Sequence, residues 1–327
     1  MQRRDLLVTL GGLLAGARPA RAGAADKVHR IGFLASGGAN ASASLVEAFR
    51  LGMREHGWIE GRNILVDYRF AEGEFDRLPA LAAGLVREPV DLIVATPSPA
   101  AVAAGRATST IPIVMASVAD PVRLGLVETL ARPGGNITGT TYSFELDIFA
   151  KQLQLLREAL PALSRVAVLS NPASPSQAQV VQSIQAAGRS MGLTLQLLEA
   201  RAPEQFEGAF AAMAQARAEA LLVASDSLFG TYAEQIGSLM LRQRLPSVNG
   251  ARANVEAGGL LLYGPNIPHS VRQATAHVDK ILRGARPGEL PVQQPLKFDL
   301  VVNLKTAHAL GITLPPSMLL RADQVIE

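Results

Sequence analysis

The sequence of 327 residues contains no cysteine. This absence excludes disulfide bonds, thiolate catalysis, cysteine-bound zinc and a lipid anchor on an N-terminal cysteine. The five histidines are scattered and show no H-E-x-x-H or other metal-binding spacing. His269 and His277 lie on one expected helix, in a spacing more typical of a solvated face than of a ligand pair. We therefore expect no metal and no cofactor.

Motifs of common enzymes are missing as well. No serine lies in G-x-S-x-G, and "RPGGN" at 132–136 lacks the G-K-[ST] ending of a phosphate-binding loop. The acid-rich "DYRFAEGEFDR" at 67–77 could hold a cation. Acidic residues at a helix start also complement the helix dipole, and we favour that interpretation. Without a catalytic constellation, we expect a protein that is not an enzyme.

A basic excess is confined to the N-terminus. The formal net charge is +3, but without residues 1–22 the chain carries 27 basic and 27 acidic residues. No basic surface for nucleic acid is therefore expected.

Residues 1–22 have the pattern of a secretory signal peptide. A basic head precedes an apolar stretch from Leu6 to Ala17, too short to span a membrane, and small residues at Ala20 and Ala22 predict cleavage near Gly23. The adjacent arginines at 3 and 4 resemble a twin-arginine export signal. We expect a periplasmic protein; a frayed basic tail on a cytosolic protein is the alternative.

The stretch "DLIVATPSPAAVAAG" at 91–105 predicts a buried strand, a tight turn and a helix. Ser98 is expected to cap that helix and Pro99 to occupy its first position. The same order of a polar residue and a proline recurs at Asp120 and Ser174, where we expect further helix starts. Helix N-termini at the carboxyl edge of a parallel sheet form a site suited to anionic groups.

Alternating strand and helix patterns extend along the chain and restart after "GGNITGTTYS". They predict an α/β fold of two doubly wound parallel-sheet lobes joined by hinge strands. We expect an N-terminal lobe at 28–140 with about 264–285, and a C-terminal lobe at 141–263. Residues 286–327 form a linker and tail whose lobe the pattern leaves open.

Six segments together resemble one family: "RIGFLASGG", "EGRNILVDYRFAEGEFDRLPALAAGLV", "ATSTIPIVMASVADPVRLGLVETLARPGGNITG", "LSRVAVLSNP", "EAGGLLLYGP" and "KFDLVVNLKTAHALGI". The chain from His29 to Glu327 resembles the ABC transporter substrate-binding proteins of the tryptophan/tyrosine type. The resemblance implies a type I periplasmic binding protein fold, with a small-molecule ligand between the lobes and an ABC permease in the inner membrane as partner.

The resemblance also implies ligand contacts at the sheet edges. The matching positions are Ser36, Thr96, Ser98 and Asp120 in the first lobe, and Asn171, Asp226 and Asn249 in the second. Tyr142 and Tyr263 join this set because they lie at predicted strand ends. The sequence departs from the family pattern at Ala95, at Pro99 and around Asp226, so the ligand's identity stays open.

The expected function is that of an extracytoplasmic solute-binding protein of an ABC importer, monomeric, which binds an amino-acid-like or aromatic carboxylate ligand. Thr96 and Ser98 suit a carboxylate, and Asp226 suits an ammonium group unless it only caps the next helix. The alternative is a ligand-sensing periplasmic protein that docks on a membrane signalling receptor.

Overall fold

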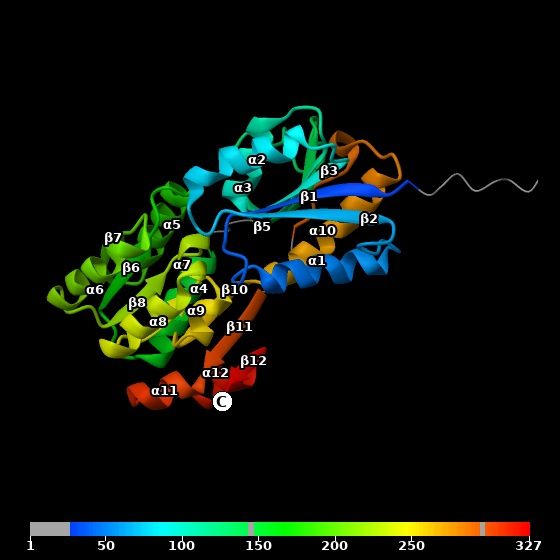
Figure 1. Cartoon of the computed structure of the whole chain (residues 1–327). Coiled ribbons are helices and arrows are strands. Elements are labelled where there is room, and N and C mark those ends of the chain that lie inside the picture. The colour runs from blue at the N-terminus through cyan, green and yellow to red at the C-terminus, as the bar shows by residue number, and fades with distance from the viewer. Residues whose placement is uncertain (1–26, 143–146, 295–297) are drawn as a thin grey trace, which may run out of the picture.

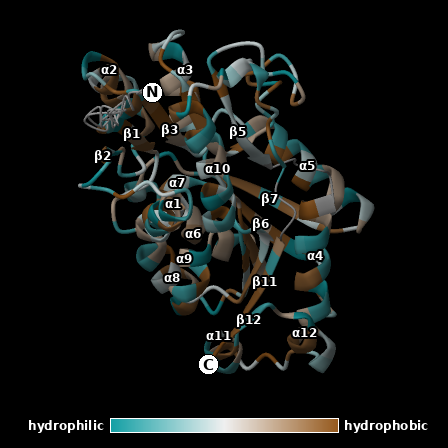
Figure 2. Cartoon of the chain, turned by 90° about the vertical axis from the view of Figure 1, so that its right-hand side faces the viewer, coloured by the Kyte–Doolittle hydropathy of each residue, from teal (hydrophilic) through white to brown (hydrophobic). Residues whose placement is uncertain are grey.

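The chain forms two α/β lobes, one above the other in Figure 1. The computed structural model describes residues 27–142, 147–294 and 298–327, without the side chains of residues 142 and 147, so the expected signal peptide lies outside this part. Apolar residues follow the strands, and hydrophilic residues cover the outer faces of the helices (Figure 2).

The first lobe contains a five-stranded sheet in the order β2-β1-β3-β4-β5. All its neighbouring strands are parallel. The strands are β1 (His29–Ala35), β2 (Ile64–Phe70), β3 (Leu92–Thr96), β4 (Ile113–Ala119) and β5 (Ile137–Tyr142). The helices of this lobe are α1 (Ala43–Glu55), α2 (Leu78–Arg87), α3 (Ser98–Ala107) and α10 (Ile267–Leu282).

The second lobe contains a seven-stranded sheet in the order β12-β11-β10-β9-β8-β6-β7. Its strands are β6 (Arg165–Ser170), β7 (Thr194–Glu199), β8 (Ala220–Val223), β9 (Ser247–Asn249), β10 (Leu261–Pro265), β11 (Phe298–Asn303) and β12 (Gln324–Ile326). Its helices are α4 (Asp147–Ala159), α5 (Gln177–Ser190), α6 (Phe206–Gln215), α7 (Ser227–Thr231), α8 (Ala233–Arg242), α9 (Arg252–Glu256), α11 (Leu304–Leu310) and α12 (Pro316–Arg321).

The tail, whose lobe the sequence pattern leaves open, belongs to the second sheet through β11 and β12. The chain leaves this lobe at Pro265 and returns at Phe298, directly beside it. Because the chain re-enters where it left, β11 runs antiparallel to β10, whereas the other neighbours in this sheet are parallel. The prediction of two parallel-sheet lobes is confirmed with this one antiparallel pair added.

Helix α10 follows β10 in the sequence but packs in the first lobe, against α1 and strands β4 and β5. Its buried residues Val271, Ala274 and Val278 share a core with β1 and α1. Gly52 of α1 faces Thr275, and a Cβ at Gly52 would lie 2.4 Å from Thr275 Oγ1. The two helices therefore approach more closely than any side chain at position 52 would permit.

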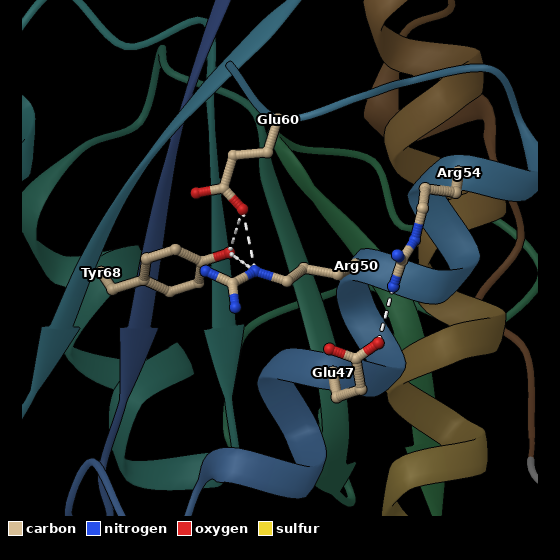
Figure 3. Close-up of polar contacts among 5 residues, drawn as sticks. All are labelled: Glu47, Arg50, Arg54, Glu60 and Tyr68. Carbon is tan, nitrogen blue, oxygen red and sulfur yellow. Dashed lines mark hydrogen bonds and ion pairs between the residues drawn. The ribbon is translucent and has the colours of Figure 1, made fainter. Parts of the chain in front are cut away.

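A polar network connects α1 to the edge strand β2 (Figure 3). Arg50 Nε donates to Glu60 Oε2 at 2.8 Å and to Tyr68 Oη at 3.2 Å, while the Tyr68 hydroxyl donates to Glu60 at 3.1 Å. Burial and the charge of Glu60 raise the pKa of Tyr68 to about 12. One turn further along α1, Arg54 pairs with Glu47. These side chains lie on the outer surface of the first lobe, where ion pairs contribute little to stability.

Two acidic residues of the segment at 67–77 accept hydrogen bonds from groups of the protein itself. Asp67 accepts two hydrogen bonds from Arg69, at 2.8 and 2.7 Å, and Glu72 accepts one from the Ala39 N–H. Among the described residues, no group of three or more histidine, aspartate or glutamate side chains is placed to hold a metal ion. Within the same residues, no helix is long and apolar enough to cross a membrane.

Candidate functional site

Both lobes present the edge at which α/β sheets bind ligands. In each sheet the first strand lies between the second and the third, so the chain order reverses between β1 and β3 and between β6 and β8. Such reversal points open a crevice at the carboxyl ends of the strands. Thr96 ends β3 beside Ala35 of β1, and Asp226 and Asn171 follow β8 and β6.

A cavity of about 670 Å³ lies between the two lobes. Its first-lobe wall includes Asn40, Thr96 and Ser98, and its second-lobe wall includes Ser174 and Asp226. This volume is within the range of small-molecule binding sites, about 300–1,000 Å³.

The first-lobe wall is built around the start of α3. The Thr96 side chain is fully buried, and its Oγ1 has no hydrogen-bond partner among the described residues. The helix begins at Ser98 itself, one residue earlier than expected, and the Ser98 hydroxyl accepts from the Ala119 N–H at 2.9 Å instead of capping α3. Pro99 follows as the second helical residue.

Few backbone donors remain at the start of α3. Pro97 and Pro99 have no N–H, and the Ala100 N–H donates to Ser36 Oγ at 3.0 Å. Ser36 is fully buried and does not line the cavity. Ser36 therefore serves as the hydrogen-bond acceptor for a backbone N–H in the first turn of α3. The Ser98 N–H and the Thr96 hydroxyl are the donors that remain for a ligand in the cavity.

The second-lobe wall is built around Asp226. Its Oδ1 accepts from Asn171 Nδ2 at 3.0 Å and from the Leu228 N–H at 2.9 Å, so Asp226 caps α7. Burial raises the pKa of Asp226 to about 6, and the hydrogen bonds from Asn171, Leu228 and Ser174 oppose this shift. Asn171 lies behind Asp226, outside the cavity lining, with its own Oδ1 accepting from the Ala173 N–H.

The lobes touch at the edge of the cavity. The Gly38 N–H of the first lobe donates to Thr231 Oγ1 of the second at 3.0 Å. A Cβ on Gly73, in the loop after β2, would lie 3.1 Å from the Cα of Leu228, and Gly73 has a φ of +79°. Glycine at this position permits both the turn and the close approach of α7.

Besides Ser36 and Asn171, three more of the predicted residues do not line the cavity. Asp120 follows β4, next to the outer strand of its sheet, and its carboxylate accepts from the Arg123 N–H. No helix starts there, because residues 121–125 form a turn that ends at Gly125 with a φ of +69°. Asn249 holds Ser247 and the Leu261 carbonyl within its own sheet. Tyr263 stacks on Phe298 at a centroid distance of 6.0 Å and packs into the core.

Tyr142 ends β5, and its side chain lies outside the described residues. Near the second expected helix start, Ser174 lines the cavity, but α5 begins at Gln177 with Ser176 as N-cap. Turns therefore replace both helix starts that were expected from a polar residue followed by proline.

Sequence reasoning missed the part of the cavity formed by β10, β11 and the segment that enters α10. Leu262, Asn266, Asp299 and Val301 line the cavity there. The signal for Asn266 is present in "GPNIP", where an N-cap asparagine precedes a proline in the first helical turn. Asp299 has no such local signal, because its position depends on the antiparallel return of β11.

The sequence profile of the family described as ABC transporter substrate binding protein matches residues 30–326. The chain belongs to this family. A tyrosine-binding protein from Clostridioides difficile is 25% identical over 266 residues, covering 81% of this substrate-binding protein and 76% of the relative. The two-lobed architecture is that of the type I periplasmic binding proteins.

Two solved structures of similar proteins differ in their state. One is an ABC domain from Streptococcus pneumoniae in complex with L-Trp: its TM-score is 0.84, at 26% identity, with 91% of this chain and 99% of that chain covered. The other is a ligand-free, open substrate-binding protein from Clostridium difficile: its TM-score is 0.66, at 25% identity and the same coverage. At nearly equal identity and coverage, this chain is therefore more similar in structure to the L-Trp complex than to the ligand-free, open protein.

Proposed function

We propose that the protein is the exported solute receptor of an ABC importer, and that it carries an amino-acid-like or aromatic carboxylate ligand to a permease in the inner membrane. The family assignment supports the transporter role, and the pattern of residues 1–22 supports export to the periplasm. The cavity between the lobes is the place for the ligand. The ligands in the names of the tyrosine-binding relative and of the L-Trp complex favour an aromatic amino acid.

The observation that carries this proposal is the pair of polar groups on opposite walls of one cavity. Thr96 offers a buried hydroxyl without a partner among the described residues, next to the Ser98 N–H. Asp226 offers a buried carboxylate from the other lobe. A ligand carboxylate bound at the start of α3 would accept hydrogen bonds from the Thr96 hydroxyl and the Ser98 N–H, and a ligand ammonium group would pair with the Asp226 carboxylate.

Apolar burial alone would not supply the whole binding free energy of a micromolar ligand. Burying an aromatic side chain of roughly 150–250 Å² contributes on the order of 4–6 kcal/mol, and micromolar binding needs about 8 kcal/mol. The polar contacts must therefore supply the difference. This requirement gives Thr96 and Asp226 a measurable share of the affinity.

A thermal-shift screen of the mature protein against the common amino acids and aromatic carboxylic acids tests the proposal. A ligand at 100 times its dissociation constant stabilises the folded state by about 2.7 kcal/mol, which raises the melting temperature. Asp226→Asn keeps the cap on α7 and removes the charge, so we expect at least a tenfold loss of affinity without loss of stability. No stabilisation by any of these compounds, or an unchanged affinity of Asp226→Asn, would contradict the assignment of the site.

Export has its own test. The intact mass of protein recovered from the periplasm should correspond to a chain that begins at or near Gly23. A periplasmic species that retains Arg3 and Arg4 would contradict cleavage at this position, and a protein that stays in the cytosol would contradict export.

A further inference from the structure

One wall of the cavity is formed by facing residues of β10 and β11. Leu262 lies opposite Val301, and Gly264 lies opposite Asp299. Directly opposed residues of an antiparallel pair project from the same face of the sheet, as do residues two apart in one strand. Leu262, Val301 and Asp299 all line the cavity, so a side chain at position 264 would point into it as well.

Position 264 leaves a recess in this wall. Gly264 is buried, yet a Cβ added there would meet no atom within 4 Å beyond its chain neighbours. Its φ is not in the left-handed region, so the turn geometry does not require glycine. The missing side chain instead leaves space next to Leu262, Val301 and Asp299.

Asp299 is held in a defined orientation beside this recess. Its Oδ2 accepts from Asn266 Nδ2 at 2.6 Å. Asn266 Oδ1 in turn accepts from the His269 N–H at 2.8 Å and caps α10. Because each end of the Asn266 amide has its own partner, the amide cannot flip without loss of both bonds. A carboxylate is thus fixed at the end of a wall that is otherwise aliphatic, with Leu262, Ile267 and Val301 beside it.

Resting on the function proposed above, we propose that the recess at Gly264 receives the distal end of the ligand's side chain, and that Asp299 accepts a hydrogen bond from an O–H or N–H group there. The ligand class is an amino acid whose apolar side chain ends in a hydrogen-bond donor. A side chain of the same shape without the donor would fill the same recess but could not make this hydrogen bond to a charged group, so it should bind more weakly. Asp299 is in this way the residue that determines specificity, while Thr96 and Asp226 bind the backbone of the amino acid.

Two matched ligand pairs test this inference by isothermal titration calorimetry. L-tyrosine and L-phenylalanine differ by one hydroxyl, and L-tryptophan and 1-methyl-L-tryptophan differ by the blocked indole N–H. We expect the wild-type protein to bind the donor-bearing member of at least one pair about tenfold or more tightly. In Asp299→Ala the donor-bearing ligand should lose at least tenfold in affinity, the other ligand should change little, and the ratio should approach one.

A further variant tests the shape of the recess, and a control variant tests whether the effect is specific to Asp299. Gly264→Val fills the recess without removing a polar group, so binding of all four aromatic ligands should fall at least tenfold. Glu256→Ala is the matched control, because Glu256 is another carboxylate that lines the same cavity, but its side chain is paired with Arg252. It should leave the ratio within each pair unchanged. Asp299→Asn keeps the shape of the side chain and replaces Asp299→Ala if the alanine variant does not fold.

The outcomes distinguish this inference from the function on which it rests. Equal binding within both pairs by the wild-type protein, or a ratio unchanged in Asp299→Ala, overturns the specificity role and leaves the amino-acid receptor intact. Binding of other amino acids but of neither pair has the same meaning. If no amino acid or aromatic acid binds, the proposed ligand class fails, and this inference fails with it.

Discussion

The Gly38 N–H of the first lobe donates a hydrogen bond of 3.0 Å to Thr231 Oγ1 of the second lobe. The Thr231 hydroxyl itself donates to the Ser227 carbonyl at 2.7 Å within α7. Thr231 therefore accepts a bond from one lobe while it is held by the other. It does not line the cavity, although its neighbour Gly230 does.

Thr231→Val should lower the affinity for every ligand by the same factor. The variant keeps the shape of the side chain but removes an acceptor that is in use when the lobes touch, so the closed state becomes less populated. A hydrogen bond of this kind contributes about 0.5–1.5 kcal/mol, which corresponds to a loss of roughly twofold to tenfold. Isothermal titration calorimetry of the wild-type protein and Thr231→Val with two ligands of different size measures this loss of affinity. A loss that differs between the two ligands would place Thr231 in contact with ligand instead.

Thr96→Val should have opposite effects on stability and on binding. The buried Thr96 hydroxyl has no partner in the described part of the chain, so its replacement by a methyl group removes an unsatisfied polar atom. We expect the ligand-free protein to melt at the same temperature or higher, and its affinity for a carboxylate ligand to fall about tenfold. Thermal unfolding with and without ligand checks both effects. A destabilised ligand-free variant would show that the hydroxyl has a structural role.

Asp226 should make the ligand-free protein less stable as the pH rises from about 4 to 6. Burial raises the pKa of Asp226 to about 6, from an ordinary value of 3.8. Between these values the unfolded chain releases the proton before the folded protein does, so the folded state loses stability with rising pH, by about 3 kcal/mol in total. Well below pH 3.8 the group is protonated in both states, and well above pH 6 it is ionised in both, so the loss extends over about pH 3 to 7.

Asp226→Asn should remove this pH dependence, because asparagine does not titrate and can still accept the bonds from Asn171 and Leu228. Urea unfolding of both proteins at a series of pH values between 3.5 and 7 would measure the difference, with the other carboxylates common to both. Parallel stability curves for the two proteins would contradict a raised pKa at this residue.

Ligand should reduce the radius of gyration of the protein. The chain passes from the second lobe to the first between Pro265 of β10 and Ile267 of α10. A rotation about a few residues at this junction would separate the walls at Thr96 and Asp226, and a ligand that bridges them favours closure. Small-angle scattering with and without a verified ligand measures the change. An identical radius in both states, with the lobes already closed, would argue against a hinge.

Local sequence pattern determined much of this molecule. The apolar runs predict strands that end at Thr96 and near Asp226, because burial on both faces is a property of a few consecutive residues. After Thr96, Pro97 adds a missing backbone donor that ends the strand. The repeated alternation of strand and helix predicts two similar lobes. The pattern placed Ser98 at a helix start and Asp226 at a strand end, and the family resemblance implied that both, with Thr96, contact the ligand. All three line the cavity.

Tertiary structure decided which edge positions meet. Asp120 and Asn249 also lie at strand ends, but neither lines the cavity. The Asp120 carboxylate accepts from the Arg123 N–H, and the Asn249 amide donates to Ser247 and to the Leu261 carbonyl inside its own sheet. Ser36 lies at the correct edge, yet the Ala100 N–H occupies its hydroxyl. Asp299 comes to the cavity only because β11 returns antiparallel beside β10. Periodicity reports which face of an element is buried, whereas strand order and pairing over long distances in sequence depend on the packing of the whole chain.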